Sequence, residues 1–142
     1  MSNEVKLADY PFHATDKIRF GDTDQQGHVN NAVFATFLET GRVELLLDGS
    51  LPELEPGTSL VIARIALDLR AEIRWPGTVG IGTRVAAVGR SSVRFEQAIF
   101  QNDRCAATAE TVIVLMDEVT RKSTPLSDSV KSALQTLAGR SP

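Results

Sequence analysis

The sequence predicts an α+β fold in which a long, curved antiparallel β-sheet wraps around one central α-helix. Three observations predict this fold. A single strong helical pattern covers residues 31–47, apolar residues alternate with polar ones through much of residues 61–116, and short polar turns join the later runs. Short turns join antiparallel neighbours, and a sheet of long strands must twist and curve. The apolar helix is the element around which such a sheet can curl.

The first expected element is a short strand over residues 15–20, with Ile18 and Phe20 on one side. A polar turn, residues 21–30, leads from this strand into the helix at 31–47. The apolar residues of the helix recur at intervals of three and four, which places them on one face. They are Phe34, Phe37, Leu38, Gly41 and Leu45. A glycine in mid-helix costs stability relative to alanine, which is explained if another element packs very close to it.

After a loop that contains proline and glycine, apolar and charged residues alternate from Val61 to Trp75, as in a strand with one face in water. Three further strands are expected at residues 81–88, 93–100 and 105–116, separated by turns at 89–92 and 102–104. Ser127 is expected to cap a short helix that reaches Leu137. The outer edge of this sheet would be open, which favours pairing with a second subunit.

Length and composition favour one cytoplasmic domain. The 142 residues fit a single domain, residues 1–142. Cys105 is the only cysteine, so an internal disulfide is impossible and a reducing, cytoplasmic setting fits best. No run is apolar and long enough to span a membrane, and Met1–Tyr10 lacks the apolar core of a signal peptide.

Charge and histidine content argue against two further classes of protein. A formal net charge of -3 argues weakly against binding to nucleic acid, which usually needs a basic surface. The two histidines, His13 and His28, have no second ligand at a usual interval, so no metal site is expected.

The segment richest in chemistry is the turn before the helix, which reads Gly-Asp-Thr-Asp-Gln-Gln-Gly-His-Val-Asn-Asn over residues 21–31. The helix is expected to begin at or near Asn31. The first backbone N–H groups of a helix have no partner within it, and the helix dipole is positive there. Such a helix start favours an oxygen that carries negative charge. A carboxylate a few residues upstream can fold back beside it, and a base or nucleophile next to an oxyanion site is what acyl transfer requires.

This motif, with part of the helix, resembles the 4-hydroxybenzoyl-CoA thioesterase-like branch of the hotdog-fold superfamily. The residues that carry the resemblance are Asp22-Thr23-Asp24, Gly27-His28-Val29-Asn30-Asn31, Phe37-Leu38-Glu39 and Arg42. The resemblance covers nearly the whole chain. It implies a hotdog fold, homodimers that often pair into homotetramers, and active sites where two subunits meet. It also implies hydrolysis of an acyl-CoA to free acid and CoA without a cofactor.

The resemblance assigns two residues to the chemistry. The family's catalytic aspartate falls on Asp24, and its oxyanion amide falls on the backbone N–H of Asn31. Asp24 then either attacks the thioester carbonyl directly or activates a water, and the sequence leaves both routes open. The acyl group, and an acyl-carrier protein in place of CoA, stay open as well.

Three further residues near the motif have competing interpretations. Another branch of the superfamily has its catalytic acid at a similar depth on this helix, so Glu39 is a candidate catalytic residue that would position water or substrate. A salt bridge from Glu39 to Arg42 or to a residue of a partner subunit is favoured slightly. His28 lies four residues after Asp24, whereas hotdog hydratases space their Asp–His pair differently, so His28 is expected to hold the turn or line the pocket. Asn30 is expected to fix the turn by side-chain hydrogen bonds or to cap the helix.

The remaining expectations concern binding and packing. Gly27 and Val29 are expected to line the substrate site with the rest of the turn, and Asp22 is expected to shape the turn. In the resembling family, the region of Arg90, Ser91 and Ser92 contacts the CoA nucleotide, and arginine suits phosphate; an ordinary polar turn is the alternative. Trp75 and Cys105 are interpreted as packing residues.

Two other functions remain possible on this fold. One is a hydratase or dehydratase that acts on acyl-CoA. The other is a non-catalytic module that binds acyl-CoA or an acyl-carrier protein, since one fold hosts many functions.

Overall fold

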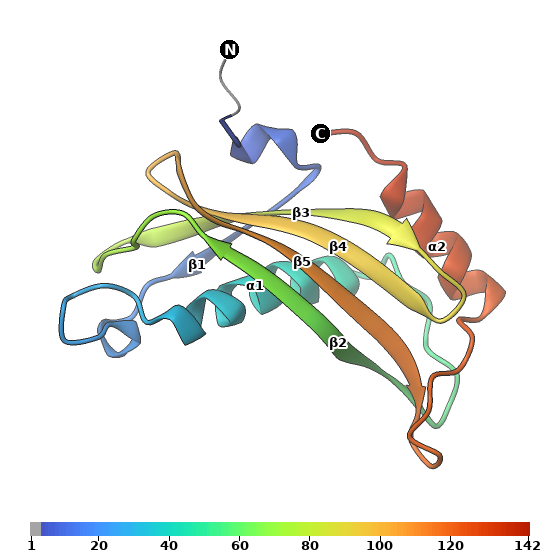
Figure 1. Ribbon diagram of the computed structural model, residues 1–142. Coiled ribbons are helices and arrows are strands. Elements are labelled where there is room, and N and C mark those ends of the chain that lie inside the picture. Colours follow the sequence, from blue (N-terminus) through green and yellow to red (C-terminus); the bar gives the residue numbers. More distant parts are fainter. Residues whose placement is uncertain (1–3) are drawn as a thin grey trace.

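The computed structural model describes residues 4–142 and shows one five-stranded antiparallel sheet that curves over a long helix (Figure 1). The strands are β1 (Phe12–Lys17), β2 (Thr58–Leu69), β3 (Thr78–Val88), β4 (Ser92–Gln101) and β5 (Arg104–Asp117). The helices are α1 (Asn31–Leu46) and α2 (Asp128–Ala138), and short 3₁₀ turns occur at Leu7–Asp9 and Phe20–Asp22. The strand order is β1-β3-β4-β5-β2, so β1 and β2 form the two edges. The predicted architecture is confirmed.

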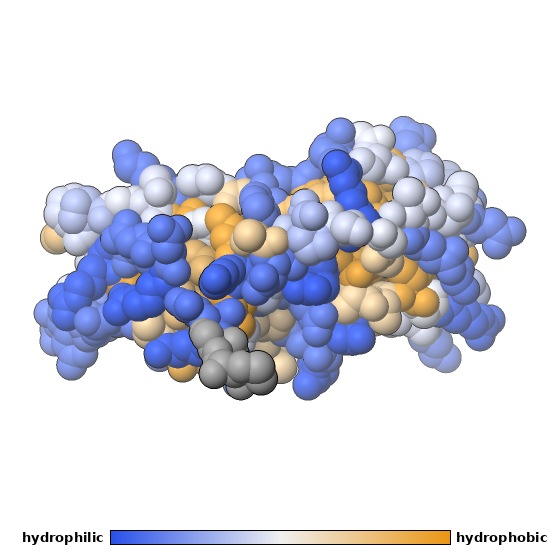
Figure 2. Space-filling view, turned by 90° about the horizontal axis from the view of Figure 1, so that it is seen from above, coloured by the Kyte–Doolittle hydropathy of each residue, from blue (hydrophilic) through white to orange (hydrophobic). Residues whose placement is uncertain are grey.

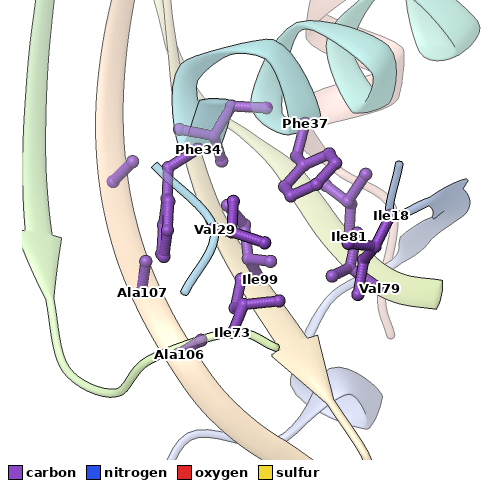
Figure 3. Packing of buried hydrophobic residues seen from close by; sticks show 12 residues of the cluster. Ile18, Val29, Phe34, Phe37, Ile73, Val79, Ile81, Ile99, Ala106 and Ala107 are labelled. Atoms are coloured by element: carbon purple, nitrogen blue, oxygen red, sulfur yellow. The ribbon is translucent and has the colours of Figure 1, made fainter. Parts of the chain in front are cut away.

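Helix α1 buries the face that its sequence pattern predicts. Phe34, Phe37, Leu38, Gly41 and Leu45 are all buried. Figure 3 shows Phe34 reaching toward Ala107 and Phe37 toward Ile81, within one apolar cluster. The helix packs on β1, β3 and β4, whereas Ile62, Ile65 and Leu69 of β2 remain exposed.

Gly41 lies where α1 comes closest to the sheet. A Cβ atom at this position would lie 2.7 Å from Cγ2 of Ile81, and 3.0 Å from Oγ1 of Thr83 and Nε2 of Gln97. Real Cβ atoms do not approach carbon atoms so closely. The expected close packing at this glycine is confirmed, and it fixes how deeply the helix sits on the sheet.

The prediction for the first strand is wrong in its position. Strand β1 ends at Lys17, whereas the sequence placed the strand at residues 15–20. Ile18 is buried just beyond the strand, but Phe20 begins a 3₁₀ turn and is 72% exposed. The chain leaves the sheet here because Asp22 Oδ2 accepts the backbone N–H of Arg19 at 2.9 Å, which closes the turn.

The long alternating run does not form one strand. Strand β2 ends at Leu69, and a bulge between Ile62 and Arg64 shifts its register. One extra residue at a bulge moves later side chains to the opposite face, so the uninterrupted alternation expected from Val61 to Trp75 is wrong. Trp75 was interpreted as a packing residue; it is 46% exposed and forms a T-shaped contact with the Phe20 ring.

The segment after β2 instead supports the turn before α1. The N–H of Val29 donates to the carbonyl of Ile73 at 2.7 Å, and His28 forms an isolated antiparallel bridge with Arg74. Both Val29 and Ile73 are buried in the core cluster around α1. Residues 70–75 therefore act as a platform on which residues 21–30 rest.

The two faces of the sheet differ in polarity. Ion pairs cross the face away from α1, such as Arg64–Glu110 at 2.9 Å between β2 and β5. Figure 2 shows the molecule from this side, largely covered by hydrophilic side chains with apolar areas between them. Toward α1, Ile62, Ile65 and Leu69 of the edge strand β2 are 45%, 40% and 49% exposed. Of the two edge strands, β2 therefore carries exposed apolar side chains on the side of α1.

The C-terminal helix agrees with its prediction. Ser127 is the N-cap of α2, and its side chain accepts the N–H of Val130 at 3.3 Å. None of the helices in the described part of the chain is long and apolar enough to cross a membrane.

Candidate active site

The turn between β1 and α1 is held by its own backbone. The N–H of Asn30 donates to the Asp22 carbonyl at 2.8 Å, and Thr23 pairs with Val29. Gly27 has a φ of +80°, a conformation that favours glycine. Gly27 therefore shapes the loop, and Asp22 makes the turn as expected, with its carboxylate on the N–H of Arg19.

Asp24 uses one carboxylate oxygen to fix its own position. Its Oδ1 accepts the N–H groups of Gln26 at 2.8 Å and His28 at 3.2 Å, and its backbone N–H donates to the His28 carbonyl at 2.8 Å. Its Oδ2 has no hydrogen-bond partner among residues 4–142. The side chain is thus held in place while one oxygen remains available for chemistry.

The start of α1 offers one unpaired amide. Asn30 is the N-cap, and its Oδ1 accepts the N–H of Ala32 at 3.0 Å. The N–H of Val33 donates to the Asn30 carbonyl at 2.9 Å. Within the described residues the N–H of Asn31 has no acceptor. Asn30 therefore takes the capping role, and the first helical N–H is left for an oxygen from outside the chain.

Asp24 and Asn31 line the same cavity, whose volume is about 360 Å³. Its other walls come from the turn, from the end of β2 and from the platform that follows β2. The full lining is Asp24, Gln26, His28, Val29, Asn31, Phe34, Leu69, Ala71 and Glu72. Asp24, which has one unpaired carboxylate oxygen, and Asn31, which has an unpaired amide, thus line one space within the described residues. A carboxylate beside such an amide is the arrangement that acyl transfer needs.

Glu72 is a residue of this cavity that the sequence did not single out. Its Oε2 lies 2.7 Å from Nε2 of His28, and its Oε1 accepts Nε of Arg74 at 3.0 Å. Because Arg74 also lies 2.9 Å from the same His28 nitrogen, Nε2 cannot serve both neighbours. The shorter contact to a carboxylate favours a proton on Nε2, donated to Glu72. The sequence analysis did not identify Glu72 as a site residue, because Glu72 is one of several charged residues on the expected solvent-facing side of a long strand.

Glu39 does not share the Asp24 cavity. It lies two turns further along α1, about 12 Å along the helix axis from Asn31, beside a second cavity of about 570 Å³. That cavity also lies between α1 and β2, and most of its lining is apolar. Its residues are Glu39, Arg42, Val43, Leu46, Leu47, Gly49, Leu51, Pro52, Glu53, Leu54, Leu60, Ile62 and Ile113.

The salt bridge predicted between Glu39 and Arg42 does not form. Arg42 turns inward, where its side chain is 3% exposed and Nη1 donates to Oε1 of Gln97 at 3.1 Å. Burial lowers the pKa of Arg42, and the charge of Glu39 opposes this only in part. The guanidinium instead bridges the helix to the sheet.

The predicted CoA-contact residues lie far from Asp24 within one chain. Arg90 and Ser91 form the β3–β4 turn, and Ser92 begins β4. Ser92 pairs with Val114 of β5. Val114 in turn pairs with Val61, near the start of β2. The cavity lies at the other end of β2, beside Leu69, roughly 25 Å away along the strand. A single chain therefore does not bring these residues to the cavity.

Cys105 packs as expected. It lies against Tyr10 and Phe100 on the face of the sheet away from α1, and burial raises the pKa of its thiol. Among residues 4–142 no cluster of three or more His, Cys, Asp or Glu side chains could hold a metal ion.

Known proteins share this fold and this sequence pattern. A family model described as the thioesterase-like superfamily matches residues 18–134. A thioesterase of Thermus thermophilus, crystallised with coenzyme A and Zn, is 28% identical; the match covers 94% of this chain and 98% of that chain with a TM-score of 0.79. No curated protein matches the chain at a significant level.

Two structures from Staphylococcus aureus share the fold at lower identity. A DHNA-CoA thioesterase is 19% identical over 80% of this chain and 79% of its own, with a TM-score of 0.74. A protein solved in complex with CoA is 13% identical over 92% of this chain and 85% of its own, with a TM-score of 0.82. The expected hotdog fold is confirmed. Because the family model spans most of the sequence, this chain belongs to the thioesterase-like superfamily.

Proposed function

We propose that this protein is an acyl-CoA thioesterase that hydrolyses its substrate to a free acid and CoA. The observation that carries the proposal is that one cavity is lined by both Asp24 and Asn31, whose Oδ2 and N–H have no partner among residues 4–142. The similar Thermus thermophilus thioesterase was crystallised with coenzyme A, which supports CoA as the thiol part of the substrate.

The mechanism follows from these two groups. The thioester carbonyl oxygen accepts the N–H of Asn31 at the positive end of α1, which stabilises the negative charge that develops on that oxygen. Oδ2 of Asp24 either attacks the carbonyl carbon or takes a proton from an attacking water. One such oxyanion donor is typically worth about a hundred- to a thousandfold in rate.

A second subunit would complete the site. The edge strand β2 exposes unpaired backbone groups and apolar side chains, and a two-fold dimer would pair the two β2 strands antiparallel. Antiparallel pairing puts the Thr58 end of one β2 beside the Leu69 end of the other. The partner's β3–β4 turn, with its arginine and two serines, would then lie near the cavity of Asp24. Two such dimers would form the tetramer that the family resemblance implies.

The acyl group would lie in the groove between α1 and β2. The cavity of Asp24 is lined by the start of α1 and the Leu69 end of β2, and the apolar cavity of about 570 Å³ is lined by the second half of α1 and by Leu60 and Ile62. The proposal places the acyl group along these two cavities. A volume of this size suits a small-molecule ligand. Each methylene buried there contributes about 0.8 kcal/mol, which corresponds to roughly a fourfold gain in kcat/KM. A long apolar acyl group is therefore expected to be hydrolysed with a higher kcat/KM than acetyl.

A screen of thiol release tests this function. Acyl-CoAs of increasing chain length, an aryl-CoA and an acyl-carrier thioester are each mixed with the protein and a thiol-reactive dye. We expect release of free thiol that rises with acyl length until the groove is filled. Absence of thiol release from every thioester would overturn the proposal, and hydration of an enoyl-CoA without thiol release would identify a hydratase instead.

A further inference from the structure

We propose that His28 is the proton carrier of the Asp24 site and that Glu72 is the positioning residue that holds it. This inference rests on the proposed thioesterase function. It assigns the ring of His28 a task different from that of its backbone, and it adds a residue outside the turn motif to the site.

The backbone of His28 is sufficient to hold the turn. Its N–H donates to Oδ1 of Asp24 and its carbonyl accepts the N–H of Asp24. The imidazole takes no part in these bonds. Within the described residues the polar contacts of the ring are those of Nε2, with Oε2 of Glu72 at 2.7 Å and Nη2 of Arg74 at 2.9 Å.

Glu72 is itself held in place. Nε of Arg74 donates to its second carboxylate oxygen at 3.0 Å, and Arg104 donates to its backbone carbonyl at 2.8 Å. The backbone bridge between His28 and Arg74 ties the two segments together. Imidazole and carboxylate therefore meet in a fixed geometry on the wall of the cavity that contains Asp24.

A carboxylate that accepts the proton of one ring nitrogen fixes the tautomer and stabilises the imidazolium that forms during general-base catalysis. With Nε2–H donated to Glu72, Nδ1 is the unprotonated nitrogen. Asp24 has no comparable partner that would stabilise its protonated form, because its Oδ1 accepts two backbone N–H groups. A division of labour follows, in which Asp24 acts on the carbonyl carbon and His28 handles the proton.

The proton balance of hydrolysis closes with this assignment. A water oxygen forms a bond to the acyl carbon, and the bond from that carbon to its leaving group breaks with the electron pair on the leaving atom. In this assignment Oδ2 of Asp24 has first displaced the CoA thiolate and formed an acyl-Asp24 anhydride, so the leaving atom when water attacks is the Asp24 oxygen. Nδ1 of His28 takes the proton from the water. The imidazolium then returns that proton to the CoA thiolate, which leaves as the thiol.

NMR of the imidazole nitrogens tests the positioning role without any substrate. The chain has only two histidines, His13 and His28, so ¹⁵N spectra of the two rings can be assigned with one variant. We expect His28 in the wild-type protein as the Nε2–H tautomer, and a mixture of tautomers in Glu72→Ala. An Nδ1–H tautomer in the wild type, or an unchanged tautomer in Glu72→Ala, would overturn the proposal.

Kinetics test the proton-carrier role with the acyl-CoA that is hydrolysed fastest. General acid–base groups typically contribute about 10²- to 10⁴-fold, so His28→Ala and Glu72→Gln should each lower kcat by at least about tenfold with little change in KM. Added imidazole should restore part of kcat in His28→Ala, which a purely structural role would not allow. His13→Asn is the matched control, since His13 binds the Tyr10 carbonyl outside the cavity.

Two results separate this inference from the proposed function. Normal kcat in His28→Ala, or a loss that imidazole does not restore, would overturn the proton-carrier role even while the wild type releases thiol. If the wild type releases no thiol from any thioester, the proposed function fails and the proton-carrier role fails with it. The NMR result still decides whether Glu72 positions the ring.

Discussion

The two carboxylate oxygens of Asp24 have different surroundings, and this difference is the basis of the proposed chemistry. Oδ1 is held by two backbone N–H groups of the turn, whereas Oδ2 is unpaired in the part of the chain that the structure describes. A side chain anchored through one oxygen loses little further freedom when the other one meets a substrate. The same cavity is lined by Asn31, whose N–H has no acceptor within the described residues.

Asn30 supports this arrangement as the cap of α1. Replacing a capping asparagine by alanine typically costs about 0.5–2 kcal/mol, because the N–H of Ala32 then loses its acceptor. We expect Asn30→Ala to lower the free energy of unfolding by about 1 kcal/mol in a urea titration. Asn30→Asp, which keeps a capping oxygen, should be close to wild type. Equal stability of the alanine variant and the wild type would show that the cap contributes nothing.

At the scale of elements, Gly41 sets how closely α1 approaches the sheet. A Cβ atom there would meet Ile81 at 2.7 Å. Overpacking of this kind typically costs about 1–3 kcal/mol, which outweighs the gain of up to about 1 kcal/mol that alanine brings to a helix. We expect Gly41→Ala to lower the melting temperature. The control is Gly21→Ala, where no atom lies within 4 Å of the added Cβ, and a more stable Gly41→Ala variant would contradict the packing described here.

The helical pattern predicted α1 well, because the burial of every third or fourth residue is a local property of the sequence. The strands were predicted less well for a physical reason. The bulge after Ile62 and the end of β2 at Leu69 depend on pairing with β5, which alternation alone does not reveal. In the site, too, residues fixed by the local sequence were predicted and a residue placed by long-range pairing was not. The turn motif identified Asp24 and Asn31, but Glu72 reaches the cavity through the long-range pairing of residues 72–74 with His28 and Val29.

For the whole molecule, the central question is whether two chains share each site. The β3–β4 turn lies at the opposite end of the strands from Asp24, so under the proposed function Arg90 would contact the substrate of the Asp24 site only from a partner subunit. A dimer made of one Asp24→Asn chain and one Arg90→Glu chain distinguishes the two arrangements. If sites are shared, one of the two sites in this mixed dimer contains both wild-type residues.

We expect the mixed dimer to recover close to half of the wild-type activity, although each parent homodimer is nearly inactive at low substrate concentration. Purification through two different affinity tags isolates the mixed species, and thiol release measures its activity. If each chain binds CoA with its own Arg90, both sites of the mixed dimer are damaged. Activity no higher than that of the parents would then contradict a shared site.

Thiol release by the Asp24→Asn variant tests the account most directly. Asparagine keeps an oxygen that can accept the N–H groups of the turn, so the fold and ligand binding should persist, but it is a poor nucleophile and a poor base. We predict a loss of at least about a hundredfold in kcat, within the range typical of acid–base groups, with an unchanged melting temperature and unchanged binding of CoA. Thiol release at the wild-type rate by a folded Asp24→Asn protein would contradict the catalytic role of Asp24.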